Sequence, residues 1–214
     1  MPKKFEVDPA CAVLISVILL FALWAAQAVF FAGNVLMYDE DGPIELLQAC
    51  LLAMASGVWL LTAFQEKRTD RLVVLFCALL CYGFFLRELD VEDFNLPDIV
   101  LFLGAGIGRN LSLLFALLAM AIYAARTGLP RHIKTAIGFS RSREGLLLVA
   151  GGVCMLLGDA FEKTAAFEHF VFFEEIAELF GYTLILLSAL GAHSKPGELE
   201  ARFQTEGELR AGKA

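Results

Sequence analysis

Six long apolar segments, separated by short stretches that hold most of the charges, constrain this chain more than any other feature of its sequence. They cover residues 10–31, 45–64, 72–86, 101–125, 145–161 and 167–191. A hydrocarbon core of about 30 Å needs about 20 apolar helical residues. A segment in lipid must satisfy its own backbone hydrogen bonds, and these runs are about twice as long as barrel strands, so they predict helices. We therefore expect an all-α polytopic membrane protein: a bundle of about six transmembrane helices over residues 1–192, then a polar cytoplasmic tail over residues 193–214.

The composition agrees with a lipid environment. Of the 214 residues, 58% are hydrophobic and 19% are charged, whereas about a quarter of the residues of an ordinary soluble domain are charged. The basic residues lie in short loops and not on one basic face, which argues against a nucleic-acid partner. The five cysteines show no disulfide framework, because four of them lie inside apolar segments. The bilayer itself is the predicted partner.

Two segments leave alternatives open. Lys3 and Lys4 precede the first segment and Ala26-Gln27-Ala28 resembles a cleavage site, but the apolar stretch is too long for a signal peptide, so we expect an uncleaved helix. Residues 97–127 exceed the length of one span, and glycines at 104, 106 and 108 interrupt them. Either a short interfacial or re-entrant piece precedes the glycines, or the helix starts early and carries Arg109 into the membrane.

The distribution of lysine and arginine predicts the orientation. Basic residues are retained in short cytoplasmic loops. With the N-terminus inside, all but three of the 17 lysines and arginines lie in the tails or in the second and fourth loops, and the exceptions are Arg87, Arg109 and Lys163. Both termini are therefore expected in the cytoplasm, and a bacterial inner membrane is the expected location.

The last apolar segment carries three carboxylates. Glu174, Glu175 and Glu178 fall within a wedge of about 100° on a helix, and Tyr182 continues that face. Glu178 lies about 12 Å along the helix from Phe170, well inside a span. A charge near the bilayer centre costs about 3 kcal/mol on insertion scales, so three approach 10 kcal/mol. The helix therefore needs compensation by protonation, by an arginine or by a bound cation.

Arg109 is the predicted internal counter-ion, because it enters the fourth segment from the same outer side and is followed by Asn110. Other segments bring polar groups to that level, which predicts one outward-facing polar chamber. The candidate metal ligands are Glu45, Glu88, Asp159, Glu174, Glu175 and Glu178, and the candidate counter-ions or polar lining are Gln48, Arg87, Arg109, Asn110, Glu162 and Tyr182. Oxygen ligands suit hard cations such as Mg²⁺, Ca²⁺ or Mn²⁺, so a divalent metal ion is the predicted cofactor. No Glu-x-x-His motif supports a di-iron site.

Three functions fit these residues. The first is an outward-facing carboxylate cluster that binds a cation or protons in a transport, sensing or binding role. The second is a membrane-embedded, metal-dependent hydrolase or transferase that acts on a lipid at the outer leaflet, which a one-sided chamber fits better than it fits a transporter. The third is a structural subunit of a membrane complex.

Overall fold

The computed structural model describes residues 9–39, 42–65, 68–89, 97–164 and 168–194, and the structural statements below concern these residues. This part of the chain contains eight α-helices, one 3-10 turn and no strand, which confirms the all-α prediction for it. The helices are α1 (Pro9–Ala32), α2 (Pro43–Gln65), α3 (Arg68–Glu88), α4 (Asp98–Gly104), α5 (Gly106–Thr127), α6 (Leu129–Ser140), α7 (Arg143–Thr164) and α8 (Phe170–His193), with the 3-10 turn η1 (Val35–Met37) after α1.

Four helices contain stretches that are long and apolar enough to cross a membrane: Cys11–Ala32 in α1, Pro43–Gln65 in α2, Gly106–Thr127 in α5 and Arg143–Phe161 in α7. Helices α1 and α5 expose many large apolar side chains, including Leu20 and Phe115, each about two-thirds exposed. Apolar surface of this extent is what a membrane covers. The chain is therefore a membrane protein with four long apolar helices, and the count of six spans stays a prediction.

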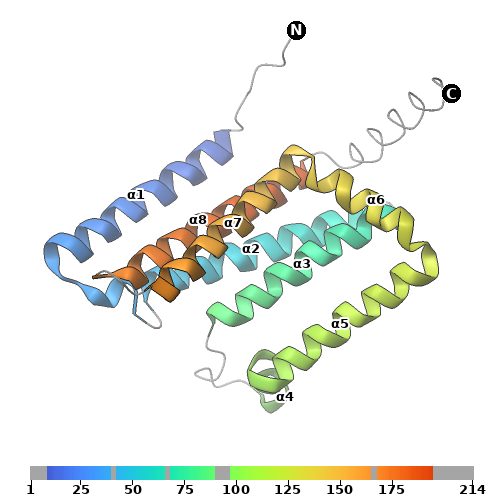
Figure 1. Cartoon of the computed structure of the whole chain (residues 1–214), viewed down its shortest axis with the longest axis horizontal. Coiled ribbons are helices and arrows are strands. Elements are labelled where there is room, and N and C mark those ends of the chain that lie inside the picture. Colours follow the sequence, from blue (N-terminus) through green and yellow to red (C-terminus); the bar gives the residue numbers. More distant parts are fainter. Residues whose placement is uncertain (1–8, 40–41, 66–67, 90–96, 165–167, 195–214) are drawn as a thin grey trace, which may run out of the picture.

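Helix α8 is the centre of the bundle. It packs along α7 and α2, and α2 packs along α3. Figure 1 shows these four helices side by side, with α1 on the flank of α8 and α5 on the flank of α3. The core between them includes Leu52, Trp59, Tyr182 and Ile185, each at most 1% exposed. Because α8 is enclosed by other helices, its polar side chains meet protein groups before they meet lipid.

Two glycines set the close approach of α7 and α8. A Cβ atom added to Gly151 would lie 2.7 Å from the carbonyl oxygen of Gly181, and one added to Gly181 would lie 2.9 Å from the carbonyl oxygen of Gly151. Small residues at helix crossings in membranes let backbones come this near. The two helices could not keep this separation with any larger residue at either position.

The predicted segment 101–125 is divided in two. Helix α4 ends at Gly104, Ala105 is extended, and Gly106 begins α5 with φ of 50°. A positive φ is accessible to glycine at little cost, which explains how the chain turns sharply here. The break therefore separates a short helix from a longer one, and Arg109 lies in the first turn of α5, within the apolar stretch long enough to cross a membrane.

Helix α6 was not predicted, since residues 129–140 were assigned to a basic cytoplasmic loop. It is a short helix with a wide separation of polar and apolar side chains, and it joins α5 to α7. Its apolar residues recur every three or four positions without forming a long continuous run, so a search for runs of membrane-spanning length passes over it.

The remaining long helices alternate in direction. Helices α2, α5 and α8 begin, and α3 and α7 end, at the same end of the bundle. Contacts of Gln48 with Glu175 and of Arg87 with Glu178 show this for α2, α3 and α8, the contact of Arg109 with Leu86 shows it for α5, and the position of Asp159 beside Glu174 shows it for α7. We call it the polar end, defined by Gln48, Arg87, Glu175 and Glu178. Most of the predicted site residues lie there, and the helix directions therefore position the candidate site.

Candidate functional site

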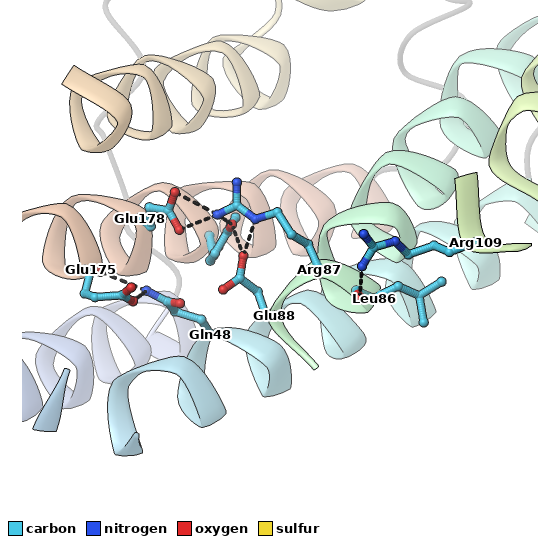
Figure 2. Close-up of polar contacts among 8 residues, drawn as sticks. Gln48, Leu86, Arg87, Glu88, Arg109, Glu175 and Glu178 are labelled. Carbon is cyan, nitrogen blue, oxygen red and sulfur yellow. Dashed lines mark hydrogen bonds and ion pairs between the residues drawn. The ribbon is translucent and has the colours of Figure 1, made fainter. Parts of the chain in front are cut away.

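Arg87 lies at the centre of the polar end, in the last turn of α3. Its Nε donates to Glu88 Oε1 at 2.9 Å, and its Nη2 donates to both carboxylate oxygens of Glu178, at 2.8 and 2.6 Å. Figure 2 shows the guanidinium between these two carboxylates. Hydrogen bonds between charged partners are the strongest of their kind. One arginine therefore ties α3 to α8 and supplies positive charge to two carboxylates.

Tyr182 closes this network from the side of α8. Its hydroxyl donates to Glu88 Oε1 at 2.8 Å and accepts a weaker hydrogen bond from Arg87 Nη2 at 3.3 Å. It lies one turn beyond Glu178, so both side chains point in the same direction from the helix. Tyr182 is fully buried and the side chains of both glutamates are 6% exposed, whereas that of Arg87 is 49% exposed. The carboxylates are thus inside, and the arginine reaches out past them.

Gln48 and Glu175 form a second, neighbouring contact. Gln48, at the start of α2, donates from Nε2 to the backbone oxygen and to Oε2 of Glu175, both at 2.9 Å. Gln48 is fully buried, and its Oε1 has no hydrogen-bond partner among the described residues. An unsatisfied acceptor in such a place is costly unless a donor reaches it. This pair joins α2 to α8 beside the arginine network (Figure 2).

A groove of about 600 Å³ lies between α3 and α7, with α8 as its floor. Near the polar end it is lined by Arg87, Asp159, Glu174 and Glu178, and farther along the helices it is lined by Leu80, Phe84, Leu148, Gly152, Met155, Leu156 and Ile185. Since α3 and α7 run toward the polar end and α8 runs away from it, the groove passes from charged to apolar over about 16 Å, counted as the helical rise from Asp159 to Leu148.

The predicted counter-ion is corrected by the structure. Arg109 donates from Nη1 to the backbone oxygen of Leu86 at 2.7 Å (Figure 2), and the guanidinium that contacts Glu178 is that of Arg87. The physical reason is that α5 packs against α3 and not against α8. Arg109 therefore satisfies a carbonyl in the last turn of α3, which has no partner within the helix. Asn110 is exposed on α5.

The other predicted site residues lie around this network. Asp159, near the end of α7, is bound by Lys163 at 2.5 Å, one turn along the same helix. Glu45 is half-buried in the first turn of α2 and Glu174 is half-buried in the groove wall. The side chain of Glu162 lies outside the described residues.

The predicted metal role gains no support from this geometry. Within the described part of the chain, no group of three or more His, Cys, Asp or Glu side chains is placed to hold a metal ion. Glu88 and Glu178 share Arg87, and Glu175 faces Gln48. These three carboxylates thus have hydrogen-bond partners within the protein.

One further contact at this end of the bundle was missed from the sequence. The hydroxyl of Tyr38, just after η1, lies 2.8 Å from Nδ1 of His169, which precedes α8 with φ of 62°. Burial, Glu168 and Asp39 raise the pKa of Tyr38, so the hydroxyl keeps its proton beside His169. The pair holds a histidine in a left-handed conformation that costs energy. The two residues are 131 positions apart, and no hydropathy pattern around either of them predicts the contact.

No protein-family model matches the sequence, and comparisons with curated proteins and with solved structures find no match.

Proposed function

We propose that the chain crosses the membrane six times, with both termini in the cytoplasm and the polar end on the outer side. Helices α3 and α8 join the four long apolar helices in this proposal, because their 21 and 24 residues span about 31 and 36 Å, enough for a hydrocarbon core. The basic residues of α6 and its neighbours belong to the cytoplasmic side. A bacterial cytoplasmic membrane is the location that we propose for the protein.

The function that the geometry supports best is the binding of a lipid-like amphipathic molecule in the groove between α3, α7 and α8. The observation that carries this proposal is the change of the groove wall from charged to apolar along the helices. Arg87 and Glu174 would meet a polar head, and Phe84, Leu148 and Ile185 would meet an acyl chain. A volume of about 600 Å³ lies within the range of small-molecule sites, and it would hold part of a lipid, such as its head and the upper part of one chain.

Lipid binding explains features that a cation site does not. The carboxylates of Glu88 and Glu178 already have a cation beside them in Arg87, so an added metal ion would meet repulsion from the guanidinium. The guanidinium is also half-exposed, so it can form a further hydrogen bond to a phosphate or carboxylate of a ligand. We propose binding of the lipid, and not a reaction upon it, because the residues that line the groove supply no nucleophile with a base beside it.

A second candidate is proton binding at Glu175. Gln48 Oε1 is buried without a partner among the described residues, and a proton on the adjacent carboxyl group would supply the donor that this oxygen lacks. This candidate preserves the hypothesis of a carboxylate cluster that serves transport or sensing. A carboxyl band in infrared difference spectra at varied pH, lost in Glu175→Gln, would support it, and an identical spectrum in the variant would exclude Glu175.

The lipid proposal is tested by filling the groove. Gly152 lines it, and a Cβ atom there would have nothing within 4 Å, so Gly152→Leu should occupy the groove without disturbing the helices. The matched control is Gly57→Leu, on the exposed side of α2, where an added Cβ is equally free. Native mass spectrometry of protein released from phosphatidylethanolamine–phosphatidylglycerol nanodiscs should show one retained lipid per chain fewer for Gly152→Leu, with the occupancy of that one site at least tenfold lower. Equal retention in both variants would overturn the proposal.

A further inference from the structure

Helix α6 lies at a face of the membrane. It connects α5 and α7, and both of these contain stretches that are long and apolar enough to cross a bilayer. Its 12 residues extend about 18 Å, too short to cross one. Figure 1 shows α6 running across the end of the bundle between the end of α5 and the start of α7. This end is opposite the polar end, and no residue of α6 is among those that line the groove.

One face of α6 packs on the bundle. His132, Thr135 and Phe139 are each at most 7% exposed. The ring of Phe139 packs edge-on against Trp59 of α2, with 5.9 Å between the ring centres, and His132 Nε2 lies 2.8 Å from the hydroxyl of Thr127. These contacts fix the rotation of α6 about its axis. The other side chains of the helix must therefore face away from the protein.

A second face of α6 is apolar and exposed. Leu129, Ile133 and Ile137 follow one another at intervals of four residues and are each 47–48% exposed. At 100° per residue they form a stripe about 130° away from the buried face. A continuous apolar stripe on a short helix beside two membrane spans is the feature by which interfacial helices enter the acyl boundary.

A third face of α6 is basic. Arg131 and Lys134 are exposed and lie about 130° from the apolar stripe on the other side. Arg126 and Arg141, just before and just after α6, are also exposed. A helix that places an apolar face in the acyl boundary holds its adjoining basic side chains at the level of the lipid phosphates. Because these four side chains share one sign of charge, they complement anionic headgroups.

We propose that α6 is an interfacial helix that binds anionic phospholipids through Arg131 and Lys134, with Leu129, Ile133 and Ile137 inserted beside their acyl chains. This surface does not depend on the groove or on its ligand. The partner is a phospholipid and not a soluble anion, because the apolar stripe needs an acyl chain to cover it. If a protein partner covered this surface instead, its binding would not depend on the presence of anionic lipid.

The test compares two lipids and two variants. Detergent-solubilised full-length protein is titrated with phosphatidylglycerol or phosphatidylcholine, and bound lipid is counted by native mass spectrometry. Each basic residue near a membrane surface contributes about fivefold in affinity for anionic lipid, so Arg131→Gln with Lys134→Gln should weaken phosphatidylglycerol binding about thirtyfold and leave phosphatidylcholine unchanged. Salt should weaken binding to the unaltered protein. The matched control is Lys163→Gln, an exposed lysine at the polar end.

Three outcomes would overturn the inference. They are equal binding of the two lipids, equal loss in the control Lys163→Gln, and full competition by glycerophosphate, which has the anionic group but no acyl chain. The charge-conserving variant Arg131→Lys with Lys134→Arg should bind phosphatidylglycerol like the unaltered protein. Because all these positions are exposed, their substitution should change folding stability little, so a loss of lipid would not be a loss of fold.

Discussion

The guanidinium of Arg87 is half-exposed, while the two carboxylates that it binds are almost completely buried. Burial of a charge is tolerated when a partner of opposite charge and hydrogen bonds replace its water. Arg87 provides both to Glu178, and Tyr182 adds a hydrogen bond to Glu88. At this scale the residue that makes the polar end stable is the arginine, because without it two buried charges would have no adjacent cation among the described residues.

Replacing Arg87 by glutamine tests this dependence. We expect the free energy of unfolding to fall by about 2 kcal/mol, less than the loss for a fully enclosed pair, because the guanidinium is half-exposed. The double variant Arg87→Gln with Glu178→Gln should recover at least half of this loss, since it also removes the stranded carboxylate. Thermal unfolding in detergent gives the order of stability. Arg126→Gln, at an exposed position, is the control, and identical melting of Arg87→Gln and this control would contradict the argument.

The sequence predicted how far along each helix the polar residues lie, but it did not predict which side chains they contact. The helical positions of Glu174, Glu175 and Glu178 follow from counting residues, and the structure places Glu178 inside the bundle. Which arginine faces it depends on the neighbours of α8, and a single sequence does not contain this. Arg87 and Arg109 stand at similar depths, but α3 packs on α2 beside α8, whereas α5 packs outside α3. Arg87 therefore takes the place that was predicted for Arg109.

At the scale of elements, long apolar runs were predicted from the sequence and short helices were not. Five of the six runs correspond to α1, α2, α3, α7 and α8, with ends that differ by a few residues, and the run 101–125 covers the end of α4 and most of α5. Helix α4 was left open as one alternative, and α6 was missed. Its signal is the recurrence of apolar residues on one helix face every four positions, at Leu129, Ile133 and Ile137. Hydropathy is averaged over all residues of a segment. The apolar and basic faces of α6 therefore cancel, and the helix is not distinguished from a polar loop.

The crossing of α7 and α8 permits a comparison of two adjacent glycines. Alanine at either position gains about 1 kcal/mol of helix propensity. At Gly151 the new methyl group would meet the carbonyl oxygen of Gly181, whereas at Gly152 it would meet nothing within 4 Å. We expect Gly151→Ala to lose about 1–3 kcal/mol of stability by overpacking, and Gly152→Ala to be neutral or slightly stabilised. Melting temperatures in detergent decide this, and equal values for the two variants would show that the helices separate freely.

At the scale of the whole molecule, the charges of α3 and α8 would conflict with the place in a membrane that we propose for these helices, and the packing of the bundle would resolve the conflict. Taken alone, α8 carries three glutamates. Within the bundle it is covered by α7, α2 and α1, so these side chains meet Arg87, Gln48 and the groove and not lipid tails. The four helices with long apolar stretches would then shield two charged ones, and a six-span topology follows if all six helices are parallel or antiparallel to the membrane normal.

Labelling of single cysteines with a membrane-impermeant maleimide tests that topology. Six exposed positions alternate along the chain: Asn34, Pro97 and Lys163 should be labelled from outside in intact cells, and Arg71, Lys134 and Ser194 only after the membrane is permeabilised. The unaltered chain controls for its five native cysteines. Each neighbouring pair of positions isolates one helix, so Arg71 and Pro97 on the same side would remove α3 from the spans, and Lys163 and Ser194 on the same side would remove α8. The reverse pattern at all six positions would keep the five spans from α2 to α8 that these positions bracket but invert the orientation, and the groove would then open toward the cytoplasmic leaflet.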